Sequence, residues 1–190
     1  MQTFVVHKSF LAHHSAYYRA AFDGRFSEGH TQSMKQSPIC IKAFGVFVRW
    51  IYTQSLQDDE GDMPSAKELA NLWILADEKL IPRLQNQAAE ALNEVFAKQP
   101  YDTDFFNHIY HHTLEGSALR RLVVHLFLGN YVMIGVADDL PRAMLVDLFN
   151  ASTESKVTKT SKLSKNMMQK YFVDEEIPER EVRRLTSAVL

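Results

Sequence analysis

Cysteine is almost absent from this 190-residue sequence, which contains only Cys40, in the apolar run Ile39-Cys40-Ile41. A single thiol cannot build an internal disulfide framework, and it cannot supply a thiolate metal cluster. Proteins that do without disulfides are typical of reducing compartments. We therefore expect a cytoplasmic or nuclear protein.

An excess of charge is lacking too, since 21 Lys and Arg residues against 23 Asp and Glu residues leave a formal net charge of −2. No global field would attract nucleic acid or an anionic membrane. The longest apolar run, residues 122–136, is shorter than a bilayer span and contains His125 and Asn130. We expect a buried helix there, no secretory signal in residues 1–7, and neither nucleic acid nor membrane as a partner.

The glycine-rich motifs that bind nucleotides and the Gly-x-Ser-x-Gly motif of hydrolases are missing, because the seven glycines are scattered singly. The one suggestive cluster is formed by Asp104, His108, His111 and His112, whose spacing could place two imidazoles of one helix face on a metal. It lacks the His-Glu-x-x-His order and a third ligand, so a helix facing solvent or a partner explains it more simply. We predict no catalytic residue, cofactor, metal or small-molecule substrate.

The sequence does contain enough apolar residues, 46%, to form a packed core. The β-branched and aromatic run at residues 2–6 predicts a strand, and residues 39–41 predict a second strand after a loop over 23–38. Helical spacing of apolar residues predicts helices over 8–22 (bent), 43–53, 65–77, 82–98, 103–114, 117–128 and 141–149. We expect an α+β fold with a helical core, a small β-sheet and an all-α extension.

Capping residues support several of these helix boundaries. Ser15 can cap a second segment within the bent helix, and Ser65 with Glu68 matches a capping box. Pro82 suits the first turn of the helix that it begins.

The stretch from residue 151 to 165 is rich in Ser, Thr and Lys and shows no apolar periodicity. Such a composition predicts a mobile linker. The lysines of this stretch are Lys156, Lys159, Lys162 and Lys165. We interpret the stretch as a solvated tether. Alternatively, its lysines could serve in nuclear import, in binding acidic partners or in control by phosphorylation. Short helices are expected near residues 167–172 and 182–190.

Several segments resemble the BTB/POZ family in their order along the first half of the chain. The family pattern is a strand, a His-Lys pair, a leucine, Ser-x-aromatic-aromatic and a closing Phe, followed by a middle strand and two further helices. The matching segments are Phe4-Val5-Val6-His7-Lys8-Ser9-Phe10-Leu11, Ser15 to Phe22, Ile39-Cys40-Ile41, Phe44 to Thr53 and Glu68 to Asp77. The resemblance implies a BTB/POZ-like domain at 1–98, a helical extension at 101–150, and a basic linker and tail at 151–190.

Two elements of the family pattern are missing before residue 4: a first strand, and the helix that builds the homodimer in many members. A strand without its neighbour leaves backbone groups unpaired at a sheet edge. A truncated gene model, a swapped oligomer, or a C-terminal segment that covers the edge would each account for this. The acidic loop at residues 57–63 is similar to that of many fungal members.

The resemblance also implies partner-binding residues. His7 and Lys8 fall at the strand-to-helix corner, which in some members lines a charged groove at the dimer face. Phe26-Ser27-Glu28 matches the loop motif of cullin adaptors, in which Phe26 would be the anchor and Glu28 would orient the pair. Alternatively, Phe26 folds back and Glu28 is solvated. We predict a protein-interaction or dimerisation module, with a substrate adaptor of a cullin-based ubiquitin ligase as the alternative.

Overall fold

The computed structural model describes residues 3–23, 27–34, 41–96, 98, 103–130, 137–153 and 162–176. The chain forms two compact units. Unit 1 comprises Met1–Pro64, Asn71–Gln85 and Asp174–Leu190, and unit 2 comprises Ser65–Ala70 and Asn86–Val173.

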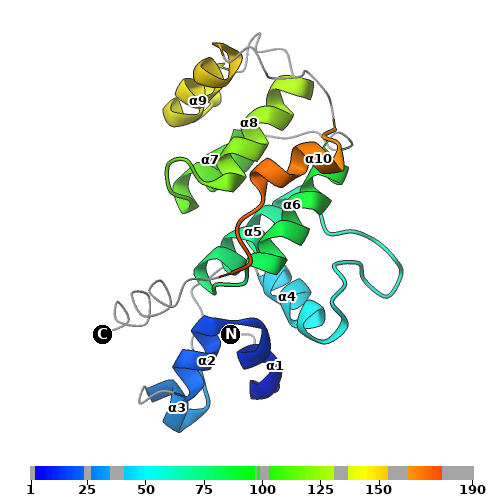
Figure 1. The fold of residues 1–190 in the computed structure, drawn as a ribbon, viewed down its shortest axis with the longest axis vertical. Coiled ribbons are helices and arrows are strands. Elements are labelled where there is room, and N and C mark those ends of the chain that lie inside the picture. Colours follow the sequence, from blue (N-terminus) through cyan, green and yellow to red (C-terminus); the bar gives the residue numbers. More distant parts are fainter. Residues whose placement is uncertain are drawn as a thin grey trace. The chain divides into compact units, whose positions relative to one another are not determined.

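Unit 1 is a set of helices joined by short connections (Figure 1), and aromatic side chains are buried between these helices. Its helices are α1 (Lys8–His14), α2 (Ala16–Asp23), α3 (Ser27–Thr31) and α4 (Ile41–Thr53), together with residues 71–78 of α5 (Ala66–Glu78) and the start of α6 (Pro82–Phe96). Tyr18 stacks on Phe47 with ring centroids 6.0 Å apart, and Trp50 is fully buried. Burial of these large rings provides much of the unit's stabilisation.

The expected α+β fold is wrong for the described chain, which has no strand among residues 3–23, 27–34 or the later described segments. Residues 3–7 are extended but form no ladder, and Ile41 begins α4; residues 39 and 40 lie outside the described part. The run of Thr, Phe and Val signalled a strand, but a strand is stabilised by its neighbours rather than by its own propensity. The fold is helical.

The helix predictions from apolar spacing are largely confirmed. The break at Ser15 separates α1 from α2, and the Ser65 capping box precedes α5. In that box the Ser65 N–H donates to Glu68 Oε2 (2.8 Å) and the Glu68 N–H donates to Ser65 Oγ (3.3 Å). The predicted loop over 23–38 misses α3, whose five polar residues carry no apolar period.

The turn from α5 to α6 places a leucine where a glycine is usual. Leu80 has φ of 53°, and the Ile81 N–H reaches back to the Ala76 carbonyl (2.8 Å). This hydrogen bond completes a Schellman-type ending of α5, and Pro82 then starts α6. Burial of the Leu80 side chain offsets the backbone strain of its left-handed conformation.

Unit 2 packs α7 (Thr103–His112), α8 (Ala118–Asn130), η1 (Ala137–Asp139) and α9 (Arg142–Thr153) with the later part of α6. A chain of aromatic contacts joins α6, α7 and α8, with the neighbouring ring centroids 5.2–6.3 Å apart; its members are Phe96, Phe105, Phe106 and Phe127. The expected buried helix is confirmed as far as Phe127, and residues 131–136 lie outside the described part. None of the described helices is long and apolar enough to cross a bilayer.

Arg120 is buried in unit 2 and connects α8 to the end of α7. Its guanidinium lies 4.4 Å from the centroid of the Tyr110 ring and donates to the Tyr110 carbonyl (2.7 Å) and to Thr113 Oγ1 (3.0 Å). The Tyr110 hydroxyl in turn donates to Asp147 Oδ2 on α9 (2.7 Å). Burial, followed by the hydrogen bond to this carboxylate, raises the pKa of Tyr110 well above its ordinary value.

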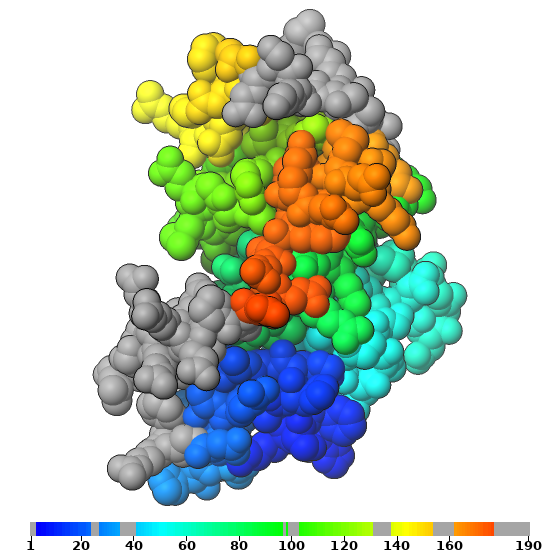
Figure 2. Space-filling model, viewed as in Figure 1, coloured from blue at the N-terminus to red at the C-terminus, as the bar shows by residue number. Residues whose placement is uncertain are grey.

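Two asparagines of α6 hold the segment that ends unit 2. Asn93 Nδ2 donates to the Leu163 carbonyl and its Oδ1 accepts from the Leu163 N–H, both at 2.9 Å. Asn86 pairs in the same way with Val173, at 3.0 and 2.8 Å. Between these residues lie α10 (Lys165–Met168) and η2 (Gln169–Tyr171), the orange segment of Figure 2.

This segment corrects the predicted mobile linker, which reached residue 165. Leu163 is only 2% exposed, and Lys162 pairs with Glu94 of α6. Residues 154–161, including Lys156 and Lys159, and the predicted helix at 182–190 lie outside the described part. The expected short helices near 167–172 are confirmed by α10 and η2.

We expect Asn93→Ala to leave the Leu163 N–H and carbonyl buried without partners, which costs about 2–4 kcal/mol. Urea denaturation measures this loss, and faster hydrogen exchange of the Leu163 amide locates it. Asn107→Ala, at an exposed position of α7, is the matched control and should change little. Equal stability of the two variants would show that Asn93 does not hold residue 163 in place.

Candidate interaction surface

Residues 4–7 contact α4 near both of its ends. The His7 N–H donates to the Tyr52 hydroxyl (2.9 Å), and the Phe4 ring meets Phe44 edge-on with centroids 4.9 Å apart. Because successive side chains of an extended segment point to opposite sides, Phe4 packs inward while Val5 is 93% exposed. The extended segment is therefore fixed on one side and open on the other.

An exposed apolar surface results, which we call the aromatic patch and define as Val5, His7, Phe10 and Tyr52. Phe10 and Tyr52 are each 42% exposed, and their ring centroids lie 4.9 Å apart. The His7 ring lies 6.2 Å from Phe10 and 6.3 Å from Tyr52. Gathered aromatic side chains with one polar tip are typical of surfaces that bind proteins.

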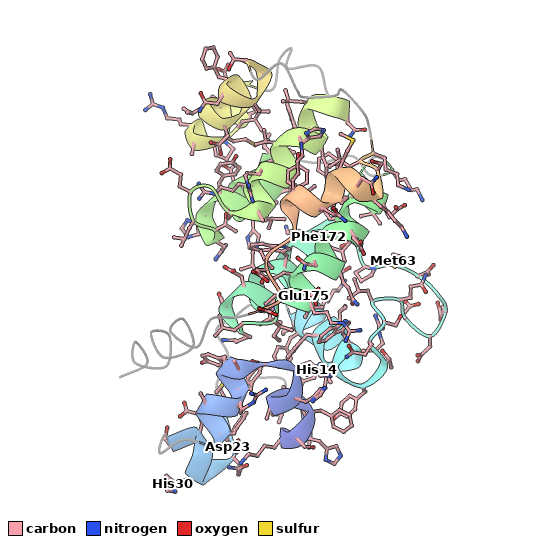
Figure 3. All side chains as sticks on the ribbon, viewed as in Figure 1. His14, Asp23, His30, Met63, Phe172 and Glu175 are labelled. Atoms are coloured by element: carbon pink, nitrogen blue, oxygen red, sulfur yellow. The ribbon has the colours of Figure 1, made fainter. Side chains whose placement is uncertain are left out.

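Lys8, the neighbour of His7, is engaged within the fold. Its Nζ donates to the Phe22 carbonyl (3.0 Å) and pairs with Asp23 Oδ1 (2.8 Å), closing the α1–α2 hairpin (Asp23 is labelled in Figure 3). The structure thus places His7 in the aromatic patch and Lys8 in the hairpin. This division was not predicted, because both residues belong to the same His-Lys motif.

Glu28 lies in the first turn of α3 and is held there by local hydrogen bonds. The Ser27 hydroxyl donates to Glu28 Oε2 (2.8 Å). A hydrogen bond from its own backbone N–H, followed by that from Ser27, lowers the pKa of the Glu28 carboxyl. Glu28 is therefore ionised at neutral pH, whereas Phe26 lies outside the described residues.

Ser15 connects the helical hairpin to the α5–α6 turn. Its Oγ accepts from the Tyr18 N–H (3.0 Å), which confirms the predicted cap, and donates to the Lys79 carbonyl (2.6 Å). Lys79 Nζ lies 4.6 Å from the centroid of the Tyr17 ring, and burial lowers the pKa of this lysine. Lys79 was not singled out in the sequence, because a lysine at a helix end is usually solvated.

The histidines of α7 gather in pairs. Ring centroids lie 4.5 Å apart for His108 and His112, and 4.9 Å apart for His111 and His112. Burial, and then the charges of His112, Lys67 and His111, lower the pKa of His108. Across the described residues, no three His, Cys, Asp or Glu side chains come together as a set that could hold a metal ion.

Exposed apolar surfaces such as the aromatic patch are found in proteins that bind other proteins. The family model described as BTB/POZ domain matches residues 1–95, half of the chain, and the chain belongs to the BTB/POZ family. Domains of this family mediate protein–protein interactions and self-association. Comparisons with curated proteins and with solved structures gave no match.

We expect Ser15→Ala to destabilise the protein by about 2–4 kcal/mol, because it removes a helix cap and leaves the buried Lys79 carbonyl without its donor. Thermal and urea denaturation followed by circular dichroism measure the change. Ser9→Ala, on the exposed side of α1, is the matched control and should stay within about 0.5 kcal/mol of wild type. If Ser15→Ala lost no more stability than Ser9→Ala, Ser15 would not connect the hairpin to the α5–α6 turn in the way described.

Proposed function

We propose that the chain is a non-catalytic scaffold whose BTB/POZ domain, residues 1–98, binds a second copy through the aromatic patch. The helical extension at 101–150 and the tail at 151–190 would then hold a further protein partner. The observation that carries this proposal is the aromatic patch, which lies within the segment matched to the family. No cofactor and no small-molecule substrate enters this function.

The physical reason for self-association is the cost of leaving this surface in water. Val5 is almost fully exposed, and Phe10 and Tyr52 are each exposed by 42%. Removing apolar surface from water contributes roughly 25 cal/mol per Å². A second copy presents the same patch, so a two-fold interface would bury both surfaces together.

The substitution Val5→Glu should weaken self-association about tenfold or more, because it places a charge in the proposed interface. Sedimentation equilibrium over a range of protein concentrations measures the dissociation constant. Leu114→Glu introduces the same charge at a leucine that is 83% exposed in unit 2 and should leave the constant unchanged. A wild type that stays monomeric at every concentration, or a Val5→Glu variant that associates like wild type, would exclude this interface.

A second candidate function is substrate adaptor of a cullin-based ubiquitin ligase. The observation that favours it is the ionised carboxylate of Glu28 in the first turn of α3, two residues after Phe26. An aromatic anchor beside a charge that sets the orientation is an effective way to bind a helical partner. The helices between residues 103 and 153 would extend the cullin-binding surface.

The double substitution Phe26→Ala/Glu28→Ala should abolish cullin retention in a pull-down from native lysate, because it removes both the anchor and the orienting charge. Circular dichroism first establishes that each protein is folded. Glu115→Ala removes an exposed carboxylate in unit 2 and is the matched control. If wild type retains no cullin, the adaptor function is wrong and the scaffold function stands alone.

A further inference from the structure

Unit 1 contains a pocket of about 290 Å³ beside the junction of α1 and α2. Its apolar lining includes Trp50, and its other wall is the turn from α5 into α6, residues 80–83. The His14 ring packs on Trp50 with centroids 5.1 Å apart, and its Nε2 lies 3.2 Å from Gln54 Nε2. The imidazole is therefore held in place at the pocket wall.

Basic groups dominate the polar lining of this pocket. They come from three helices, α1, α2 and α6, and are His13, His14, Arg19 and Arg83. Arg19 Nε donates to the Ala12 carbonyl (3.0 Å), which fixes the start of its guanidinium group. Within the described part of the chain, neither arginine forms an ion pair.

The positive potential of Arg83 reaches the His14 ring. Burial, followed by the charges of His13 and Arg83, lowers the pKa of His14, while a backbone hydrogen bond to Ile51 opposes this shift. A pocket in which cationic groups disfavour each other's charge is stabilised by an anion placed among them. Carboxylates and phosphates are the anions that arginine binds best.

One carboxylate lines the pocket, and it belongs to this chain. Glu175 follows η2 in the acidic run Asp174-Glu175-Glu176, and Figure 3 labels both Glu175 and His14. An acidic peptide segment is therefore the kind of ligand that this pocket already meets. We propose that the pocket is a binding site for an acidic peptide of a protein partner, with Glu175 as the intramolecular competitor.

This inference adds a partner class to the interaction module and uses a surface separate from the aromatic patch and from Glu28. The probe is a fluorescent peptide with the sequence of residues 172–177, Phe-Val-Asp-Glu-Glu-Ile, and its neutral form has Asn and Gln in place of the acids. Both are titrated by anisotropy into the full chain at low and high salt. Self-association of the same samples is measured in parallel, so loss of peptide binding can be told apart from loss of the scaffold function.

The acidic peptide should bind, the neutral peptide should not, and salt should weaken binding. Arg83→Gln should weaken it about fivefold or more, because a charge-assisted hydrogen bond is lost, and Glu175→Gln should tighten it because the competitor is removed. Arg121→Gln, an exposed site on α8, is the charge-matched control and should bind like wild type. Arg19→Gln, at an exposed position of the same pocket, removes one positive charge and repeats the test should Arg83→Gln fail to fold.

Three results would overturn the proposal. These are equal binding of the acidic and neutral peptides, equal binding by wild type and Arg83→Gln, and complete displacement of the peptide by an equal concentration of inorganic phosphate. The last result would identify a simple anion site rather than a peptide site.

Discussion

The buried Ser15 is the residue on which unit 1 depends, because each of its polar groups fixes a different element. Its N–H ends α1 on the Leu11 carbonyl, its carbonyl accepts the first hydrogen bond of α2 from Arg19, and its hydroxyl bonds to both Tyr18 and Lys79. A serine that is 1% exposed thus sets the angle of the hairpin and attaches it to the α5–α6 turn. The same contacts position the walls of the pocket that is lined by His13, His14, Arg19 and Arg83, which we call the basic pocket.

Sequence reasoning succeeded where the signal is local. Helical spacing and capping residues such as Ser15, Ser65 and Pro82 placed the helix boundaries within a few residues, since these features act within one or two turns. It failed for the strand at residues 2–6, because a β-prone run needs a partner strand that its own sequence does not report. It did not distinguish Lys8 from His7, because their different contacts are with Asp23 and Tyr52, which lie elsewhere in the sequence.

Composition was misleading for the segment after residue 161, for a related reason. Leu163 is one apolar residue in a stretch of Ser, Thr and Lys, and local burial would not offset the cost of ordering it. Asn93, 70 residues earlier, provides two hydrogen bonds to its backbone, and α6 thereby orders a segment of unpromising composition. A single asparagine that hydrogen-bonds to a backbone N–H and carbonyl produces no pattern in the sequence. The roles of Asn86 and Asn93 could therefore not be predicted from the sequence.

The Glu175 carboxylate in the basic pocket lowers the affinity of any acidic partner that binds there. A carboxylate on the same chain acts at a high effective concentration, so a free acidic peptide competes at a disadvantage. A partner overcomes this by offering more than one carboxylate, or by adding apolar contacts on a neighbouring surface of the same unit. Because charge mainly sets orientation and rate while buried aromatic contacts set affinity, a natural partner would combine an acidic stretch with an apolar anchor. Because of this competition, an isolated acidic segment would bind more weakly to the wild-type chain than to a chain without the Glu175 carboxylate.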